Sequence, residues 1–223
     1  MYLLKNITGR KLIMALSGFT MIAFVVVHLL GNTSMYFGPD ATNAYAKTVH
    51  RFGSVLWVFR LFMLAMLTLH VFFGIRLTLE NRAAKPQGYA VKKNLQSTFA
   101  SRNMIWTGLL IAVFIVYHLL HFTFQVTNPQ FAAVAHFDAM GRPDVFTMVV
   151  LSFRKFFISA IYIFAMGALG LHLSHSIQSA FQTVGLNSEK TFPIIINAGT
   201  IAALLVSFGF ASIPVAVFTG LIK

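Results

Sequence analysis

The sequence predicts an all-α integral membrane protein with five transmembrane helices, and composition and hydropathy both lead to this fold class. Of the 223 residues, 57% are apolar and only 10% are charged, and the mean hydropathy is +0.77. A soluble domain carries about 25% charged residues, so most soluble enzymes, nucleic-acid-binding modules and disordered proteins are excluded. Five apolar runs each exceed the roughly 20 residues that cross a hydrocarbon core about 30 Å thick. These runs cover residues 12–36, 53–79, 103–126, 147–181 and 193–221.

The first run is expected to be a retained helix, because it is longer than the apolar part of a signal peptide. The fourth run is long enough for its helix to project beyond the bilayer. Turn-forming residues lie between the runs. They are Gly38-Pro39-Asp40, Lys85-Pro86-Gln87-Gly88, Gly141-Arg142-Pro143-Asp144, and Asn187 before Pro193. Because the connections are short, we expect residues 1–223 to form a single transmembrane domain.

The formal net charge of +12 is interpreted as charge that sets membrane topology, with no nucleic acid as a partner. Nine basic residues fall outside the spans on the N-terminal side: Lys5, Arg10, Lys11, Arg82, Lys85, Lys92, Lys93, Arg102 and Lys190. Four fall on the opposite side: Lys47, Arg51, Arg142 and Lys223. Because cytoplasmic segments carry the excess of Lys and Arg, we expect a cytoplasmic N-terminus and an outer C-terminus.

The chain contains no cysteine and eight histidines. The lack of cysteine excludes disulfides, thiolate metal sites, iron–sulfur ligation and cysteine nucleophiles, so a metal must be held by other residue types. A proton-translocating transporter would favour an acidic residue at mid-membrane. All five acidic residues here lie in connections or at span ends: Asp40, Glu80, Asp138, Asp144 and Glu189.

An internal repeat relates the first helix to the third and the second helix to the fourth. At an offset of 90 residues, Ser17-Gly18 and His28-Leu29-Leu30 match Thr107-Gly108 and His118-Leu119-Leu120. At an offset of 102 residues, His70 matches His172. Leucine and phenylalanine matches are common in any membrane protein, whereas the histidine matches favour a two-helix duplication.

The positions of four histidines along their helices indicate two haem sites. At 1.5 Å rise per residue, His28 and His118 lie about 8 and about 10 residues before the outer side. His70 and His172 each lie about 10 residues before the cytoplasmic end of their helices. Two pairs at two depths have the geometry of two stacked bis-histidine haems, although lone buried histidines can also serve only to join helices. We therefore expect the first four helices to form a haem-binding bundle.

Several neighbouring residues have a structural interpretation beside a functional one. His121 and His175 each follow a candidate ligand by three residues, and we interpret both as lying beside the haem sites or at helix interfaces. Ser17 and Thr107 each precede a candidate ligand by 11 residues, which places them at the depth of the inner haem. They can hydrogen-bond in the surroundings of that haem, but small residues also allow close helix packing.

The motifs resemble the two-haem cytochrome b membrane anchor of succinate dehydrogenase and fumarate reductase, in its single-anchor, five-helix class. The first helix carries the resemblance in Met14-Ala15-Leu16-Ser17-Gly18, Phe24 and His28-Leu29-Leu30-Gly31-Asn32. It continues in order through Leu69-His70-Val71, Thr107-Gly108 to His118, and His172-Leu173-Ser174. The resemblance covers essentially the whole chain. It implies that His28 and His118 hold the outer haem b and that His70 and His172 hold the inner one.

The resemblance also implies partners and a location. An FAD flavoprotein subunit and an iron–sulfur subunit would lie on the cytoplasmic side of a bacterial cytoplasmic (inner) membrane, docked near the basic segment 82–102. The complex would exchange electrons between succinate or fumarate and membrane quinone, with menaquinone as the expected quinone. This chain would supply only the quinone and electron-transfer half of the enzyme and would otherwise contact membrane lipid. Some fumarate-reducing members carry a proton-transferring glutamate two residues before the fourth ligand, where this chain has Gly170.

A quinone site needs a haem edge, access from lipid and a titratable or hydrogen-bonding group. The outer connection from residue 37 to 52 contains Asp40, Asn43, Tyr45, His50 and Arg51. A histidine pKa near 6.5 suits reversible proton exchange, and the resemblance favours an outer site. We therefore predict that His50 and Arg51 contact quinone, with His136 and Asp138 as second candidates.

Two other functions fit the composition. The chain could be the haem b subunit of another membrane dehydrogenase, of the formate dehydrogenase or hydrogenase type, although helix count and ligand order argue against it. It could also be a haem-free transporter, which a reduced-minus-oxidised spectrum would exclude.

Overall fold

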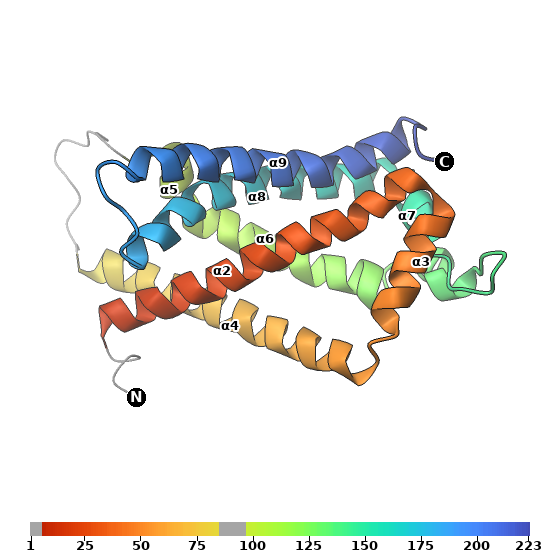
Figure 1. The fold of residues 1–223 in the computed structure, drawn as a ribbon, viewed down its shortest axis with the longest axis horizontal. Coiled ribbons are helices and arrows are strands. Elements are labelled where there is room, and N and C mark those ends of the chain that lie inside the picture. The colour runs from red at the N-terminus through yellow and green to blue at the C-terminus, as the bar shows by residue number, and fades with distance from the viewer. Residues whose placement is uncertain (1–5, 85–96) are drawn as a thin grey trace.

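The computed structural model describes residues 6–84 and 97–223, and these form helices joined by turns with one isolated β-bridge between Phe137 and Pro143 (Figure 1). Five helices are long and apolar enough to cross a membrane, which confirms an all-α, multi-pass membrane fold. The five candidate spans are Ile7–Phe37, Ser54–Ala83, Met104–Thr123, Phe156–Thr183 and Phe192–Phe218.

The helices follow the apolar runs closely, with short helices added in the connections. The long helices are α2 (Ile7–Asn32), α4 (Ser54–Ala83), α6 (Met104–His118), α8 (Phe156–Thr183) and α9 (Phe192–Phe218). The shorter α-helices are α3 (Pro39–His50), α5 (Phe99–Arg102) and α7 (Val145–Phe153). A π-helical turn η2 (Leu119–Thr123) extends α6, and three short 3₁₀ turns are η1 (Thr33–Phe37), η3 (Pro129–Phe131) and η4 (Ala133–Ala135).

The prediction of a single helix over residues 147–181 is wrong. The run is divided at Arg154 and Lys155, where Lys155 adopts an extended conformation at the start of α8. Ser159 of α8 donates a hydrogen bond of 2.5 Å to the carbonyl of Phe153, the last residue of α7. Apolar residues on both sides of the two charges make the run look continuous, but α7 is a separate short helix and α8 alone forms the span.

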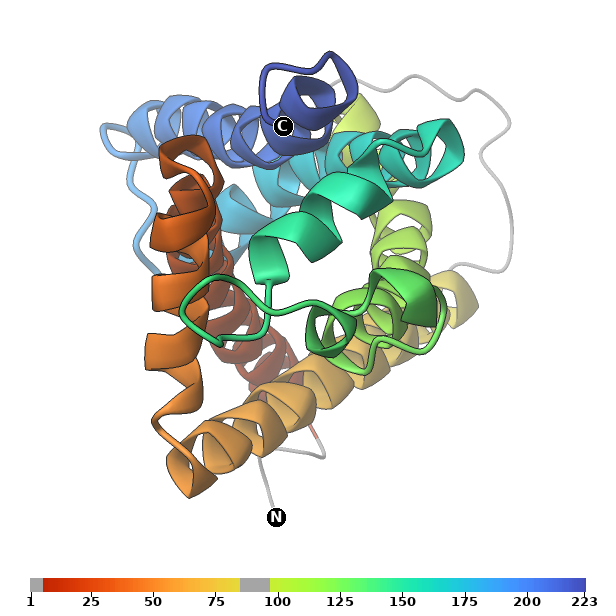
Figure 2. The same ribbon diagram turned by 90° about the vertical axis from the view of Figure 1, so that its right-hand side faces the viewer.

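The first four long helices form a bundle in which sequence neighbours pack side by side. α2 packs against α4 and α8, and α6 packs against the same two helices. α2 and α6 therefore face each other across one diagonal of the bundle, and α4 and α8 face each other across the other (Figure 2). α9 lies outside the bundle against α8 and α2. Any side chain that joins helices across a diagonal must therefore lie in the interior of the bundle.

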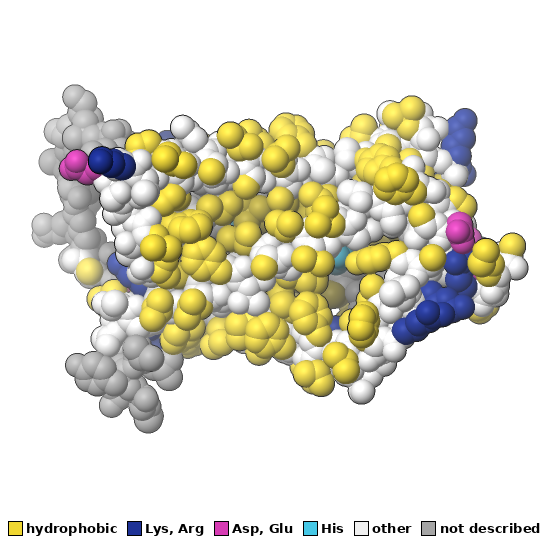
Figure 3. Space-filling view, in the orientation of Figure 1, with side chains coloured by type: hydrophobic (Ala, Val, Ile, Leu, Met, Phe, Trp, Pro, Cys, Tyr) yellow, Lys and Arg dark blue, Asp and Glu magenta, His cyan; other side chains and the backbone are white. Residues whose placement is uncertain are grey.

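The surface has the pattern of a protein in a lipid bilayer. Large apolar side chains of α4, such as Val58, Leu61 and Leu64, are more than half exposed. On the face drawn in Figure 3, apolar side chains cover the middle of the molecule, and Lys, Arg, Asp and Glu gather at its two ends. At one end, Glu80 of α4 accepts a hydrogen bond from Arg10 of α2 at 2.8 Å and one from Arg76 at 2.9 Å. The Arg10–Glu80 contact joins α2 to α4 beside the start of α2.

Candidate functional site

Four histidines meet as two pairs inside the bundle, and each pair joins helices that face each other across a diagonal. His28 of α2 and His118 of α6 have ring centroids 5.9 Å apart; we call them the outer pair. His70 of α4 and His172 of α8 have ring centroids 6.3 Å apart; we call them the inner pair. His70 and His172 are each the seventeenth residue of their helix, which agrees with the repeat. The pairing deduced from helical depth is therefore the pairing of the structure.

The spacing within each pair matches that of two imidazoles on opposite sides of one metal ion. With metal–nitrogen bonds of about 2 Å, coaxial imidazoles have ring centroids about 6 Å apart. The interplanar angles are 82° in the outer pair and 71° in the inner pair. Such angles are compatible with axial ligation, because each ring can rotate about the axis through the metal. Within residues 6–84 and 97–223, no three His, Asp or Glu side chains gather around one point. Each pair therefore offers two imidazoles and no third His, Asp or Glu ligand within the described residues.

The surroundings of His70 fix which of its ring nitrogens carries the proton. Its Nδ1 lies 3.2 Å from the carbonyl oxygen of Met14 and 3.4 Å from the Oγ of Ser17. A carbonyl can only accept, so Nδ1 must be the donor. The Ser17 hydroxyl donates its own proton to backbone carbonyls at 2.9 and 3.0 Å, so it also acts as an acceptor toward His70. Nε2 of His70 is consequently unprotonated and free to bind a metal ion.

The second half of the repeat reproduces this arrangement around His172. The Oγ1 of Thr107 lies 3.3 Å from the Nδ1 of His172, and the Thr107 hydroxyl donates to the carbonyls of Asn103 and Met104 at 3.1 Å. His172 is also hydrogen-bonded to the backbone of Met104, which matches Met14 at the offset of 90 residues. The two halves therefore present the same imidazole nitrogen to the interior.

The glycines of the repeat make room for the two inner rings. A Cβ atom on Gly18 would lie 3.3 Å from Cε1 of His70, and one on Gly108 would lie 3.1 Å from Cε1 of His172. Both distances are tighter than an ordinary van der Waals contact. Ser17-Gly18 and Thr107-Gly108 therefore act as matching cradles, in which the hydroxyl contacts Nδ1 and the glycine accommodates the ring edge.

The outer pair has different neighbours. The ring of His28 stacks on Phe24 with centroids 5.4 Å apart and contacts Phe210 of α9 at 5.7 Å. The Asn32 amide nitrogen lies 3.4 Å from both ring nitrogens of His28 and donates to the His28 carbonyl at 2.7 Å. The Nδ1 of His118 lies 3.3 Å from the hydroxyl of Tyr162.

The histidines of both pairs are only partly buried, although they point into the bundle. One buried apolar cluster, among α7, α8, α9 and η1, reaches the outer pair through Tyr162, and the other lies between α8 and α9. Figure 3 shows a histidine side chain (cyan) at the floor of a hollow on this face of the molecule. The four histidine side chains are therefore partly accessible within the bundle.

His50 and Arg51 lie at the end of α3 and are exposed. His50 Nδ1 lies 2.8 Å from the carbonyl of Ala46, one turn earlier in the same helix, and Arg51 is the C-cap residue. The structure thus gives His50 a contact within its own helix, and a role in quinone binding stays a prediction. His136 Nε2 lies 3.3 Å from the carbonyl of Gln130.

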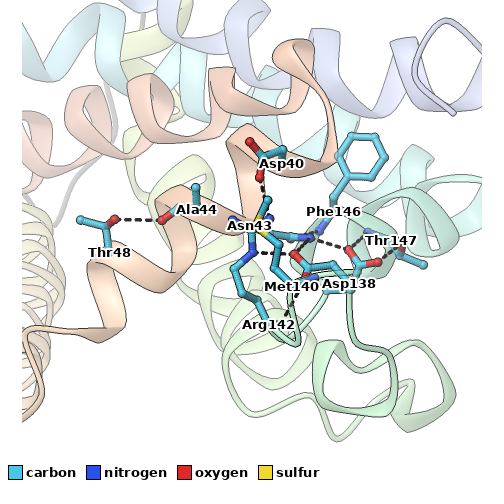
Figure 4. A network of polar contacts seen from close by, with 10 residues as sticks. Asp40, Asn43, Ala44, Thr48, Asp138, Met140, Arg142, Phe146 and Thr147 are labelled. Carbon is cyan, nitrogen blue, oxygen red and sulfur yellow. Dashed lines mark hydrogen bonds and ion pairs between the residues drawn. The ribbon is translucent and has the colours of Figure 1, made fainter.

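Asp138 belongs to a polar network that joins the connection containing α3 to the connection that precedes α7 (Figure 4). It accepts a hydrogen bond from Arg142 Nε at 2.6 Å, while Arg142 Nη2 pairs with Asp40 at 2.7 Å. Buried Asn43 donates to Asp138 at 3.3 Å and to Asp144 at 3.0 Å. Sequence reasoning proposed Asp138 for quinone chemistry, whereas its contacts are those of a residue that holds the connections together.

The network shifts the pKa values of its charged groups. Burial raises the pKa of Asp138, but hydrogen bonds from Arg142 and Met140 outweigh burial and bring it to about 2. Burial likewise raises the pKa of Asp144, but hydrogen bonds from Thr147 and Asn43 leave it below its usual value. Hydrogen bonds to Asp40 and Asp138 raise the pKa of Arg142. All these groups are therefore charged at neutral pH.

The two additional histidines do not join the pairs. His121 contacts Tyr162 of α8 and Ser152 of α7, and it is almost completely buried. His175 Nδ1 lies 2.8 Å from the Nε2 of Gln178 in the same helix. Sequence reasoning did not identify Tyr162 or Ser152; the one available signal was a polar side chain inside an apolar run.

Two further expectations concern the docking segment 82–102 and Gly170. Lys5, Lys85, Lys92 and Lys93 lie outside the described residues, so the proposed docking segment 82–102 is described only at its edges. Gly170 packs against α9, and a Cβ atom there would lie 2.7 Å from Ser207 Oγ. A glutamate at residue 170 would require Ser207 to move.

Comparisons of the chain with models of protein families, with curated proteins and with solved structures found no match. The interpretation of the site therefore rests on the residues and geometry described above.

Proposed function

We propose that this chain is the membrane-anchor and electron-transfer subunit of a succinate:quinone oxidoreductase, in which four histidines hold two haem b groups. His28 and His118 would hold one haem iron, and His70 and His172 would hold the other. The observation that carries the proposal is the pairing of histidines across both diagonals, at centroid separations of 5.9 and 6.3 Å.

The donor set fits haem b. Each pair offers two imidazoles, and the Nδ1 contacts of His70 and His172 leave their Nε2 atoms unprotonated. Each haem iron would be held by two imidazoles of the chain, which suits electron transfer better than oxygen binding. The glycines at residues 18 and 108 leave space at the ring edges. A bound haem b supplies reversible one-electron chemistry of iron, which the side chains of this chain lack.

The residues of the chain have separate tasks in this proposal. Met14 and Ser17 orient His70, and Thr107 orients His172, because a fixed Nδ1 donor keeps the ligand nitrogen available and raises its basicity. The apolar faces of the spans exclude water from the interior and keep the protein in the lipid.

Partners and orientation belong to the same proposal. The excess of basic residues beside the start of α2 supports a cytoplasmic position for that end, in the inner membrane of a bacterium. A flavoprotein and an iron–sulfur subunit would dock there and carry the succinate and fumarate chemistry. Menaquinone would be the substrate of this chain, and His50 and Arg51 its predicted contacts.

A second candidate function shares the same haem sites. The chain could serve another membrane dehydrogenase, since paired histidines indicate the cofactor and not the donor enzyme. Identification of the subunits that purify with the chain separates the two candidates.

The deciding experiment measures haem in the purified complex. Pyridine haemochrome analysis is expected to give about two haem b per chain, both low-spin. His28→Leu and His118→Leu are each expected to remove one spectral component, and His70→Leu and His172→Leu the other, with His175→Leu as control. A haem content near zero, or loss of one common component in His28→Leu and His70→Leu with the other retained, would reject the proposed pairing.

A further inference from the structure

Three buried polar side chains beside the outer pair are not among the candidate ligands. Ser152 of α7 is 0% exposed, His121 of η2 is 3% exposed and Tyr162 of α8 is 6% exposed. They lie among apolar and aromatic residues that include Phe122 and Phe153. Burial of such groups costs free energy unless each has a hydrogen-bond partner, so each of the three is expected to be hydrogen-bonded.

The three side chains form a continuous hydrogen-bonded chain that starts at His118. The Tyr162 hydroxyl lies 3.3 Å from His118 Nδ1 and 2.9 Å from His121 Nδ1. His121 Nε2 lies 3.1 Å from Ser152 Oγ, and Ser152 donates its hydroxyl proton to the carbonyl of Met148 at 2.7 Å. This hydrogen-bonded chain thus connects α6, α8, η2 and α7.

The Met148 carbonyl determines the direction of every bond in this chain. Ser152 has one proton and gives it to that carbonyl, so its oxygen accepts from Nε2–H of His121. A neutral imidazole with Nε2 protonated has a lone pair on Nδ1, which accepts the proton of the Tyr162 hydroxyl. The Tyr162 oxygen then accepts from Nδ1–H of His118.

We propose that Ser152, His121 and Tyr162 are positioning residues that hold His118 in the tautomer needed for metal ligation. With Nδ1 protonated, His118 keeps its Nε2 lone pair available on the side of the ring away from Tyr162. The inference rests on the proposed function for the identity of the metal group, but the hydrogen-bond direction does not depend on it. Supporting residues of this kind commonly set the orientation and basicity of ligand histidines.

The π-helical turn η2 supports this arrangement. The backbone N–H of Phe124 bonds to the carbonyl of Leu119 at 2.8 Å, five residues earlier, which widens the helix at His121. π-helical turns occur frequently at functional sites. Here the turn lies directly after His118, so His118 ends a regular helix and His121 reaches α7 and α8.

The last bond of the hydrogen-bonded chain, from Ser152 to Met148, argues against a proton-conducting path. The last acceptor is a backbone carbonyl, and Val150 and Phe153, on the same short helix, belong to a buried apolar cluster. A carbonyl cannot pass a proton onward. A series of hydrogen bonds with one fixed donor-to-acceptor direction can, however, hold His118 in one tautomer and orientation.

The first test replaces Ser152, the far end of the hydrogen-bonded chain, which three hydrogen bonds separate from His118. In Ser152→Ala the outer component, identified as the one lost in His28→Leu, is expected to shift in midpoint potential and in its ferric low-spin electron paramagnetic resonance signal. The inner component is expected to stay unchanged. Ser159→Ala is the matched control, since Ser159 is a buried hydroxyl that donates only to the Phe153 carbonyl in the described structure. An unchanged outer component in Ser152→Ala would overturn the inference.

A second set of variants separates polarity from packing, in case Ser152→Ala damages the fold. His121→Gln keeps an acceptor for Tyr162 and a donor for Ser152, whereas His121→Leu keeps only apolar volume. The outer signal is expected to persist in His121→Gln and to shift or disappear in His121→Leu. Tyr162→Phe is expected to behave like His121→Leu, and Tyr117→Phe, which contacts the same rings, like the unaltered protein. Equal signals in the Gln and Leu variants would contradict a positioning role.

The tautomer itself can be measured independently of haem function. ¹⁵N-histidine-labelled full-length chain in detergent, reduced with dithionite, is expected to show His121 with Nε2 protonated and Nδ1 unprotonated; subtraction of the His121→Gln spectrum assigns the signal. The opposite tautomer would overturn the inference. Protein that lacks haem but shows the expected tautomer would reject the proposed function alone.

Discussion

Ser17 Oγ lies 3.4 Å from Nδ1 of His70, and this contact joins the first helix of the bundle to the second. The same relationship recurs 90 residues later, where Thr107 Oγ1 lies 3.3 Å from Nδ1 of His172. The repeat is thus visible in the structure as two equivalent helix pairs, each with a hydroxyl held against a histidine. The inner pair arises where these two units face each other.

Removal of either hydroxyl is expected to weaken the inner site and leave the outer site intact. Ser17→Ala and Thr107→Val each delete one acceptor for an Nδ1–H, and loss of such a partner costs about 10-fold to 100-fold in metal affinity. We expect less inner haem, with a higher midpoint potential, because the less basic imidazole stabilises ferric iron less. Redox titration of the purified complex measures both. Thr20→Val is the control, since Thr20 is bonded only to the Leu16 carbonyl among its described contacts.

The glycine cradles predict that one added methyl group disturbs the inner pair. Gly→Ala inside a helix normally stabilises by about 0.5–1 kcal/mol. At Gly108, however, the new Cβ would lie 3.1 Å from His172 Cε1, so the ring must move by a few tenths of an ångström. Gly108→Ala is expected to reduce the inner haem signal selectively. Gly167→Ala, where a Cβ meets nothing within 4 Å, serves as control. Equal effects of both substitutions would contradict the cradle.

Much of the fold and the pairing of the histidines follow from sequence, because straight helices relate residue number to depth in a simple way. Depth alone assigns His28 to His118 and His70 to His172. The break at Arg154 and Lys155 does not follow, because hydropathy averages over the two charges.

The hydrogen-bond partners of the histidines are harder to predict than their depth. From sequence, Ser17 and Thr107 could be placed only at the depth of the inner pair. Their contacts depend on the rotation of α2 relative to α4 and of α6 relative to α8. Tyr162 and Ser152 were missed, since their partners lie on elements far apart in the sequence. Helix rotation about its own axis, which sequence periodicity specifies poorly in a uniformly apolar span, decides such contacts.

The predicted quinone contacts can be tested by selective kinetics. His50→Leu and Arg51→Leu are expected to retain both haem signals while lowering the quinone-linked rate, by about 100-fold if one of them transfers protons. The rate with an artificial acceptor that bypasses quinone is expected to stay the same. Lys47→Leu, an exposed basic residue on the same helix, is the control. Unchanged quinone kinetics in both variants would show that neither His50 nor Arg51 contributes to quinone binding.

The network at Asn43 is expected to stabilise the end of the molecule that carries α3 and α7. Asn43 Oδ1 accepts from the backbone N–H of Phe146 at 3.0 Å, in a buried position. Asn43→Ala leaves that donor without a partner, at a cost of about 1–3 kcal/mol. Thermal unfolding in detergent is expected to occur at lower temperature, whereas Thr48→Ala, an exposed residue of the same helix, is expected to unfold like the unaltered protein.

The same network predicts acid sensitivity. The pKa of Asp138 is depressed to about 2 in the folded protein, below its ordinary value of 3.8. The stabilisation is therefore complete above the unfolded pKa and is lost as pH falls from about 4 through about 2, because only the unfolded state takes up the proton over that interval. Unfolding temperatures measured over this range should fall steeply in the unaltered protein and less in Asp138→Asn. Parallel curves for the two proteins would exclude this role of Asp138.

The contact between Gly170 and Ser207 predicts a rescue by a second substitution. Gly170→Ala places a Cβ 2.7 Å from Ser207 Oγ, at the interface of α8 and α9, and such overpacking costs about 1–3 kcal/mol. Ser207 Oγ has no hydrogen-bond partner in the described structure, so Ser207→Ala alone is expected to be neutral or mildly stabilising. The double variant should recover most of the loss, because the oxygen is gone and Cβ of residue 207 is 3.3 Å away. Additive effects of the two substitutions, measured by unfolding in detergent, would show that the clash is not between these residues. Gly170→Glu is expected to cost more than Gly170→Ala, which would explain in packing terms why this position holds no carboxylate.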